Sequence, residues 1–329
     1  MIRILNIEPD GYSPEALAIL EDLGEVVNHA MSRADLLAEV LDCDVLIVRL
    51  KHAIDRDVID QGKRLKAIVS ATTGLDHIDV AYANDKGIRV LALQGESEFL
   101  RTISATAEHT WGLLLALVRR IPSAFVSVRG GGWDRDLFRG TDLVGKRLGI
   151  MGLGRIGGKV ACYGKAFAMD VAAYDPYADV WVGGVSRATS LSDLIVRSDV
   201  FSVHVPLKRE TRGLVGRKEL DLLPRGTILI NTSRGEVIDE GALVQALEVG
   251  HLAGAAVDVI AGEQEAERRE ESALLAYART HDNLLITPHI AGATVESMAK
   301  TEIFMARKLV SFMRSHSRRP ARTVRGTKP

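Results

Sequence analysis

A glycine-rich turn between a strand pattern and a helix pattern constrains the fold of this chain more than any other feature. The segment GIMGLGRIGGKV, residues 149–160, contains Gly152, Gly154 and Gly157 in the spacing G-x-G-x-x-G. In such a turn the first glycine permits the tight bend, the second lets the backbone approach a pyrophosphate, and the third allows the helix to pack closely on the strand. The segment therefore predicts a helix N-terminus that binds phosphate groups.

An acidic residue follows the next strand pattern. The stretch DVAAYD ends in Asp175, and 175 − 152 = 23 is close to the spacing of about 20 residues that is typical of a dinucleotide site. A carboxylate at this position accepts hydrogen bonds from the adenosine ribose hydroxyls and repels a 2′-phosphate. The sequence therefore predicts NAD rather than NADP as the cofactor.

Strand and helix patterns alternate along most of the 329 residues. Helix patterns lie at 13–24 and 32–41, and Ser13 and Pro14 have the residue types expected at the start of a helix. Strand patterns lie at 2–7, 44–49, 66–72, 146–152, 170–175, 199–206, 227–233, 253–259 and 283–289. This alternation and the chain length predict two α/β domains, each with a parallel sheet covered by helices.

Charge and composition exclude several classes of function. The formal net charge is −1, so we expect no general attraction to nucleic acid or to an anionic membrane surface. The basic stretch at 314–329 is interpreted as a solvated terminus rather than a nucleic-acid-binding arm. The chain has two cysteines, no signal-peptide pattern, no cluster with metal-ligand spacing and no apolar run of about 18 residues. These observations predict a cytoplasmic protein without a metal site or a membrane span.

A long apolar helix pattern covers residues 102–120 and is ended by Pro122. Its small and apolar residues are too numerous for one exposed face. Two interpretations remain open. The helix packs on its own domain and on a second copy of the chain, which predicts a homodimer, or it is an internal core helix.

Polar residues follow three of the later strand patterns, at the ends where parallel sheets bind ligands. Arg234 follows TILINTS, Asp258 and Glu263 follow GAAV, and His289 follows NLLITP. A guanidinium can hold a carboxylate and the neighbouring carbonyl oxygen, while an imidazole can exchange a proton with that oxygen. Glu263 would orient the ring of His289 and favour its charged form. Together with a nicotinamide, these groups predict hydride transfer at C2 of a 2-hydroxy or 2-oxo acid.

The chain resembles the D-isomer-specific 2-hydroxyacid dehydrogenases, which include D-3-phosphoglycerate dehydrogenases. The stretches that carry the resemblance span most of the chain: TTGLDHID, SATAEHTWGLLLAL, GIMGLGRIG, AYDP, HVPL, LINTSRGEVIDEGAL, GAAVDV and TPHIAGAT. The resemblance implies two doubly wound parallel-sheet domains, with an NAD-binding Rossmann domain (102–290) inserted into a flavodoxin-like substrate domain (1–101 and 291–329). It also implies that the helix near 102–120 forms much of a dimer interface.

The resemblance also implies roles for individual residues. Arg234 would bind the substrate, His289 would be the acid/base and Glu263 its partner, while the backbone amides near Thr73 and Gly74 would hold the substrate carboxylate. The residues around NAD would be Gly152, Gly154, Arg155, Ile156, Gly157, Asp175, Val205, Pro206, Thr232, Asp258 and Gly292.

The sequence departs from the family pattern in three places. The run GEQEAERREES stands where many relatives have Glu-Pro, so Glu265 remains an alternative to Glu263. The stretch from Glu263 to His289 is longer than usual, and its extra charged residues predict a surface excursion. Arg49 matches an arginine that contacts phosphate in the phosphoglycerate enzymes, whereas Ser70 stands where those enzymes tend to have a second arginine. Phosphoglycerate is therefore one candidate substrate, beside short or sugar-derived 2-hydroxy acids.

Two other functions remain open for a chain with these motifs. One is an NAD-sensing corepressor, in which the dehydrogenase site acts as a ligand switch with weak turnover. The other is oxidation of formate or phosphite, which uses a similar arginine and histidine without a C2 carbon.

Overall fold

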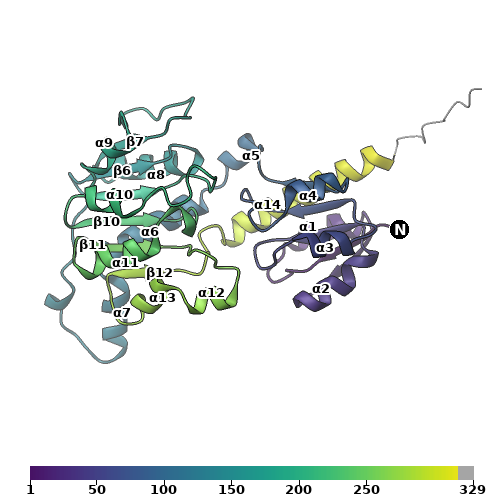
Figure 1. Cartoon of the computed structure of the whole chain (residues 1–329), viewed down its shortest axis with the longest axis horizontal. Coiled ribbons are helices and arrows are strands. Elements are labelled where there is room, and N and C mark those ends of the chain that lie inside the picture. Colours follow the sequence, from purple (N-terminus) through teal and green to yellow (C-terminus); the bar gives the residue numbers. More distant parts are fainter. Residues whose placement is uncertain (318–329) are drawn as a thin grey trace, which may run out of the picture. The chain divides into compact units, whose positions relative to one another are not determined.

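The computed structural model describes residues 1–317, which divide into two units (Figure 1). The first unit contains Met1–Ser97 and the C-terminal segment that begins at Val295, and the second contains Glu98–Thr294. The predicted domain boundaries, after 101 and after 290, each differ from these by four residues. Most of the predicted basic terminus, from residue 318 on, lies outside the described residues.

The first unit is built on a five-stranded parallel sheet. Its strands are β1 (Arg3–Asn6), β2 (Glu25–Asn28), β3 (Val45–Val48), β4 (Ala67–Ser70) and β5 (Arg89–Ala92). Their order, β2-β1-β3-β4-β5, is the flavodoxin-like one. Every residue of β3 and β4 is buried, as expected for apolar strands with helices on both faces.

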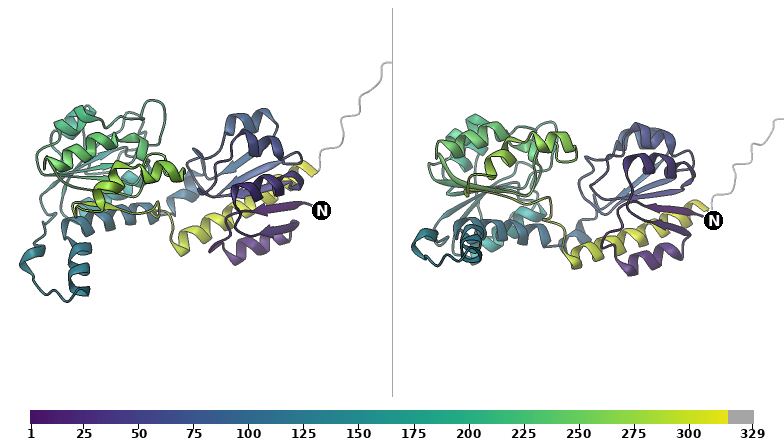
Figure 2. Two further views of the ribbon diagram at one scale, coloured as in Figure 1. Left: turned by 60° about the horizontal axis from the view of Figure 1, so that its bottom comes forward. Right: turned by 90° about the horizontal axis from the view of Figure 1, so that it is seen from below.

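Helices cover both faces of this sheet (Figure 2). They are α1 (Pro14–Glu21), α2 (Arg33–Glu39), α3 (Arg56–Gln61), α4 (Val80–Asp85) and α14 (Val295–Ser317), with a short 3₁₀ turn η1 (Val40–Asp42) after α2. As predicted, Ser13 caps α1, and its side chain accepts a hydrogen bond from the Ala16 amide. The chain therefore returns to the first unit through α14, which packs against α1.

The second unit is built on a seven-stranded parallel sheet. Its strands are β6 (Arg147–Met151), β7 (Asp170–Tyr174), β8 (Ser186–Arg187), β9 (Val200–Val203), β10 (Thr227–Asn231), β11 (Leu252–Val257) and β12 (Leu284–Ile286). The order is β12-β11-β10-β9-β6-β7-β8, so the direction of winding reverses between β6 and β9. Ligands of doubly wound sheets bind at the carboxyl ends of strands beside such a reversal. Both sheets confirm the predicted fold class.

Helices and two buried apolar clusters complete the second unit. The helices are α5 (Ser97–Arg101, which starts at the last residue before this unit), α6 (Ala105–Val118), α7 (Ile121–Arg129), α8 (Arg155–Ala166), α9 (Leu191–Ile195), α10 (Arg217–Leu222), α11 (Glu240–Glu248), α12 (Ala266–Glu270) and α13 (Ala273–Ala278), with 3₁₀ turns η2 (Asp136–Phe138) and η3 (Gly235–Val237). The predicted surface excursion contains α12, which has no buried residue.

The helix predicted over 102–120 is shorter than expected, and Pro122 is not what ends it. It corresponds to α6, which ends at Val118, and Arg120 then adopts a left-handed conformation with φ of 54°. Pro122 lies in the first turn of α7, where its missing amide proton breaks no helical hydrogen bond. Pro122 therefore helps to start a second helix, while the left-handed Arg120 separates the two.

Two further features of the described residues bear on function. No single helix among residues 1–317 is long and apolar enough to cross a membrane, although Ser97–Val118 and Ile121–Arg129 meet that criterion together as a pair bent by 63°. Within the same range, no group of three or more His, Cys, Asp or Glu side chains is arranged to hold a metal ion.

Candidate active site

The glycine turn between β6 and α8 has the geometry that each glycine was expected to provide. Gly152 has a φ of +93°, and a Cβ on it would lie 2.9 Å from the backbone carbonyl of His204. A Cβ on Gly157 would lie 2.0 Å from the Gly152 oxygen, so only glycine lets α8 begin this close to the strand. Gly154 is exposed, and a Cβ on it would meet no atom within 4 Å. The middle of the turn is therefore open for a ligand to approach the backbone.

Two further observations fit a dinucleotide at this turn. Gly154 is the N-cap of α8 and provides no side-chain acceptor for the first amides of the helix, so those amides are suited to phosphate oxygens. Asp175 follows β7 and accepts hydrogen bonds from the amides of Leu153 (2.8 Å) and Tyr177 (2.9 Å). These bonds hold its carboxylate against the glycine turn, as a ribose-binding acid requires.

The other predicted cofactor residues follow the carboxyl ends of neighbouring strands. Sheet register pairs Asn231 with Val257 and Val257 with Ile286. The next residues, Thr232 and Asp258, therefore lie at one edge. Val205 and Pro206 follow β9, Arg155 and Ile156 begin α8, and Gly292 follows β12.

A histidine that the sequence did not indicate also lies at this edge. His204 directly follows β9, and its ring nitrogen Nε2 lies 2.8 Å from the Ser202 hydroxyl. Desolvation lowers the pKa of His204 to about 3, so the ring is neutral at physiological pH. The only sequence signal was its place in HVPL directly after a strand. Its backbone carbonyl is the group that Gly152 must approach.

The structure brings two of the three predicted catalytic side chains into direct contact. Nδ1 of His289 makes a short hydrogen bond to Oε1 of Glu263. Because a carboxylate only accepts, the proton of this bond belongs to Nδ1, which leaves Nε2 as the ring atom that can exchange a proton. Glu265, the alternative acid, instead forms an ion pair of 2.9 Å with Arg268 on the surface.

Asp258 holds the segment that carries His289. Its carboxylate is buried, with 1% of the residue exposed, and accepts hydrogen bonds from the Thr287 hydroxyl (2.6 Å) and the amides of Ile290 (2.9 Å) and Ala291 (2.8 Å). The Asp258 carbonyl also accepts the amide proton of His289 at 2.8 Å. These bonds stabilise the left-handed conformation of His289, whose φ is 54°. Asp258 was predicted as a cofactor residue, and its carboxylate is engaged by the protein.

Arg234 lies in the turn after β10, next to the loop that carries Glu263. Its guanidinium donates to the Ser233 carbonyl at 2.7 Å, and its own carbonyl accepts from Asn231 Nδ2 at 2.9 Å. A Cβ on the following Gly235 would lie 2.1 Å from the carbonyl carbon of Ile260, so the turns after β10 and β11 pack backbone to backbone. Arg234, Glu263 and His289 thus come from three adjacent strands, β10, β11 and β12, at one sheet edge.

The predicted substrate residues of the first unit lie at the carboxyl ends of β3 and β4. Thr73 is exposed, and the Gly74 carbonyl accepts a hydrogen bond of 2.8 Å from the Thr72 hydroxyl. Arg49 directly follows β3, and its guanidinium lies 2.9 Å from the buried carboxylate of Glu302.

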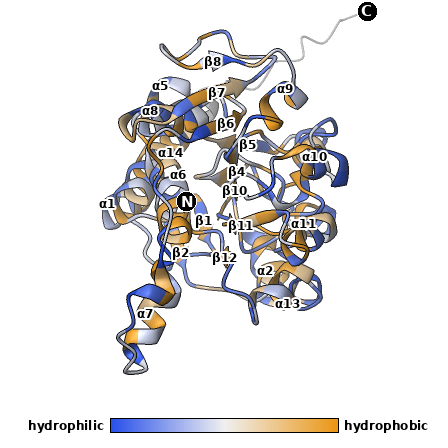
Figure 3. Cartoon of the chain, turned by 90° about the vertical axis from the view of Figure 1, so that its left-hand side faces the viewer, coloured by the Kyte–Doolittle hydropathy of each residue, from blue (hydrophilic) through white to orange (hydrophobic). Residues whose placement is uncertain are grey.

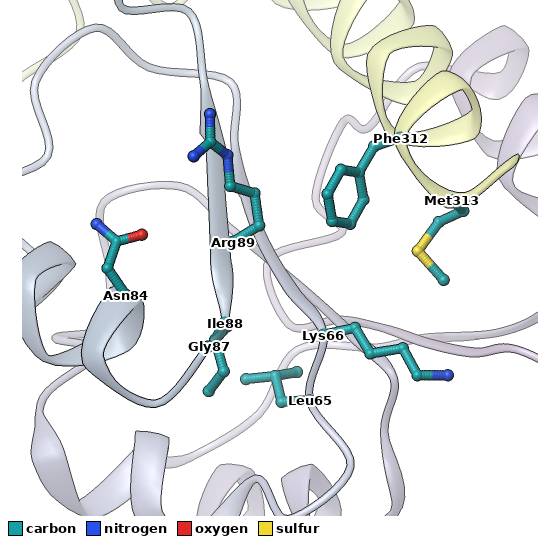
Figure 4. A pocket seen from close by; sticks show the side chains of 8 residues that line it. All are labelled: Leu65, Lys66, Asn84, Gly87, Ile88, Arg89, Phe312 and Met313. Atoms are coloured by element: carbon teal, nitrogen blue, oxygen red, sulfur yellow. The ribbon is translucent and has the colours of Figure 1, made fainter. Parts of the chain in front are cut away.

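A cavity of about 720 Å³ lies elsewhere in the first unit (Figure 4). It is found near the amino ends of β4 and β5, beside α14, and its lining includes Lys66, Arg89 and Phe312. None of the predicted site residues lines it.

Comparison with known proteins identifies the family. Residues 111–291 match the model of the NAD binding domain of D-isomer specific 2-hydroxyacid dehydrogenases. A D-3-phosphoglycerate dehydrogenase of Methanocaldococcus jannaschii is 38% identical over 95% of this chain, and a hydroxypyruvate reductase of Thermotoga maritima is 36% identical over 93% of it. The solved structure of Aquifex aeolicus D-lactate dehydrogenase complexed with NAD and lactic acid has a TM-score of 0.82 at 29% identity, covering 95% of this chain and 96% of that one.

The relatives differ in length. This chain spans 58% of the Methanocaldococcus enzyme but 96% of the Thermotoga reductase. The predicted resemblance is confirmed: the chain belongs to the D-isomer-specific 2-hydroxyacid dehydrogenases, and residues 111–291 correspond to the NAD-binding domain of that family.

Proposed function

We propose that this protein is an NAD-dependent dehydrogenase that interconverts a D-2-hydroxy acid and the corresponding 2-oxo acid. The observation that carries the proposal is the hydrogen bond between His289 Nδ1 and Glu263. This bond engages Nδ1 and leaves Nε2 of His289 as the ring nitrogen that can exchange a proton with a substrate. The ring lies at the same sheet edge as the glycine turn. We further propose that the unit 98–294 is the NAD-binding domain and that the other unit is the substrate domain.

The residues of the glycine turn and Asp175 would hold the cofactor. The amides that begin α8 are suited to the pyrophosphate, and Asp175 is suited to the adenosine ribose. When bound, NAD supplies the hydride acceptor of the oxidation, and NADH the hydride donor of the reduction.

The chain's own residues have three tasks in the reductive direction. Arg234 binds the substrate carboxylate and stabilises negative charge on the C2 oxygen, while the amides near Thr73 and Gly74 hold the carboxylate. Protonated His289 gives the proton of Nε2 to that oxygen. Glu263 keeps the ring oriented and stabilises its charged form, in the manner of the acid in other histidine–carboxylate pairs.

The names of the relatives support small 2-oxo acids as substrates. They include a hydroxypyruvate reductase, a glyoxylate reductase of Aeropyrum pernix that is 38% identical, and several phosphoglycerate dehydrogenases. The direct test is NADH oxidation with glyoxylate, pyruvate, hydroxypyruvate and phosphohydroxypyruvate, run beside NAD reduction with formate and with phosphite. We expect turnover with at least one 2-oxo acid and a loss of about 10²–10⁴-fold in kcat for His289→Asn, with NADH affinity unchanged.

Each alternative has its own signature in this test. Turnover of formate or phosphite alone would assign the protein to that chemistry. Tight NADH binding without turnover of any compound would favour the ligand-sensing function. Near-normal turnover by His289→Asn would remove the acid/base role.

We also propose that the protein is a homodimer whose interface is formed by α7 and the loop after it. The predicted interface helix, α6, is largely buried in its own unit, whereas α7 extends away from the rest of that unit (Figure 3). Several apolar side chains of α7 are exposed. Phe125 is 61%, Val126 67% and Trp133 91% exposed, and contiguous exposure of this kind is typical of an interface. Segment 119–142 also contains both arginines and aspartates, so two copies related by a twofold axis could pair opposite charges.

The oligomeric state can be measured by light scattering after size exclusion. We expect a dimer for the wild type and a monomer for Phe125→Asp combined with Val126→Asp. The control is Val249→Asp, which changes an apolar side chain that is 60% exposed at the C-terminal end of α11 and should remain dimeric. A monomeric wild type would refute the proposal.

We also propose a cytoplasmic location, which the two unpaired cysteines, Cys43 and Cys162, support.

A further inference from the structure

The carboxyl edge of the first unit's sheet has two groups suited to a second anion. Arg49 directly follows β3, at the edge where ligands of parallel sheets bind. Its guanidinium is a fork of donors for a carboxylate or a phosphate. The backbone amides of Arg49, Leu50 and Lys51 follow one another and all point to one acceptor, which is an anion-binding arrangement.

The carboxylate of Glu8 already occupies these three backbone amides. Glu8, which follows β1, accepts hydrogen bonds from the amides of Arg49 (3.0 Å, Oε1), Leu50 (3.3 Å, Oε2) and Lys51 (3.2 Å, Oε2). An anionic ligand would have to displace this carboxylate to use these amides.

A second internal carboxylate holds the guanidinium. Glu302 of α14 is 1% exposed, and its Oε1 lies 2.9 Å from Arg49 Nη2. Its Oε2 accepts the amide proton of Ser13 at 2.6 Å, and Arg49 Nη1 donates to the Asp10 carbonyl at 3.0 Å. If Arg49 turned toward a ligand, Glu302 would remain buried without its cation, which is strongly unfavourable.

The remaining groups at this edge do not replace the lost positive charge. Ser70, at the end of β4, is a neutral hydroxyl that lies 2.8 Å from the Thr72 hydroxyl and 3.4 Å from His77 Nε2. Lys51 is exposed, and a hydrated ammonium on a flexible chain contributes little to a specific anion site.

We propose that Glu302, by holding Arg49 inside the first unit, restricts the enzyme to 2-oxo acids whose carboxylate is their only anionic group and selects against acids phosphorylated at C3. Glu302 is thus a specificity-determining residue that acts through Arg49. This inference rests on the proposed dehydrogenase function and decides between the two substrate classes that the names of the relatives leave open.

The test compares hydroxypyruvate with phosphohydroxypyruvate as substrates for NADH oxidation. We expect the kcat/KM of the wild type to favour hydroxypyruvate by roughly tenfold or more. This factor corresponds to one charge-assisted hydrogen bond to the phosphate that Arg49 does not make. Glu302→Gln removes the internal anion and should shift the ratio of the two kcat/KM values toward the phosphorylated acid by roughly tenfold. Glu296→Gln is the matched control, because it makes the same charge change at an exposed position of α14 and should leave the ratio unchanged.

A binding measurement keeps the inference testable if Glu302→Gln folds poorly or if no substrate turns over. Calorimetric titration of the wild-type protein with D-glycerate and with 3-phospho-D-glycerate, both in excess NADH, should show the tighter binding for D-glycerate. Preference of the wild type for the phosphorylated compound, in turnover or in binding, would overturn the inference. An unchanged ratio in folded Glu302→Gln would also overturn it. Absence of turnover with every 2-oxo acid, together with normal NADH binding, would instead count against the proposed function.

Discussion

Replacing Gly157 by alanine tests how the turn between β6 and α8 is built. A Cβ at this position would lie 2.0 Å from the oxygen and 3.1 Å from the carbon of the Gly152 carbonyl. Real Cβ atoms essentially never come closer than 3.0 Å to such an atom, so the turn and the helix must separate by about 1 Å. The group that has to move is backbone, which has no rotamer to relieve the contact.

Two opposing effects determine how much Gly157→Ala changes the free energy of unfolding. Overpacking of this kind costs about 1–3 kcal/mol, while alanine gains up to about 1 kcal/mol over glycine in a helix interior. We therefore expect the free energy of unfolding to fall by about 1–2 kcal/mol. A shift of about 1 Å also misplaces the amides that begin α8, and the loss of one charge-assisted hydrogen bond weakens NADH binding by about tenfold or more.

Urea denaturation and titration of NADH fluorescence measure the two effects. The matched control is Gly158→Ala in the same helix turn, where a Cβ would be 3.5 Å from Val182 Cγ2, an ordinary contact. This variant should be as stable as the wild type or more stable by up to about 1 kcal/mol. If Gly157→Ala matched Gly158→Ala in both stability and NADH affinity, the reasoning about the close approach would be refuted.

Three further predictions concern charged residues of the second unit. Glu263→Gln should lower kcat by about 10²-fold or more in steady-state assays with little change in NADH affinity, because the imidazolium of His289 loses its counter-charge; equal turnover would remove the partner role. Asp258→Asn should lower the free energy of unfolding by about 2–3 kcal/mol in urea denaturation, because a buried carboxylate that accepts three hydrogen bonds is replaced by an amide that cannot accept at both atoms; wild-type stability would contradict this. The hydrogen bonds and charge of Arg147 hold the pKa of Asp199 in the folded protein below its usual 3.8. The ion pair therefore stabilises the folded protein fully above pH 3.8, and this contribution is lost as the pH falls through the lowered pKa of the folded state. Asp199→Asn should therefore cost about 1 kcal/mol at pH 7, with the difference from the wild type shrinking below pH 3.8, and a difference that grows in acid would contradict the sign.

Much of the fold could be predicted because its signals are local. The glycine spacing, the Ser13 cap and the apolar strand runs each depend on neighbours within about one turn or one strand, so they can be found in the sequence directly. The short strands β2 and β5 give a weak apolar signal, because each has four residues and only Leu91 and Ala92 of β5 are buried. Parallel pairing then follows from the alternation of strands and helices.

The candidate site could be located to a sheet edge from the sequence, because the carboxyl ends of parallel strands share one edge. Local patterns could not choose between Glu263 and Glu265, since both follow β11 in a charged loop. The fold brings Glu263 to the ring of His289 and leaves Glu265 on the surface with Arg268. The support of His289 by Asp258 likewise requires β11 and β12 to be neighbours.

The sequence by itself determined the strand–helix alternation, the glycine turn with its acid, and the set of polar residues that end neighbouring strands. Only the tertiary structure decided what those groups contact. Arg49 and Glu302 are 302 − 49 = 253 positions apart, and they meet because the last helix returns to the first unit. The free energy of a charge depends on the groups around it in space and on its exclusion from water, and neither can be obtained from spacing along the chain.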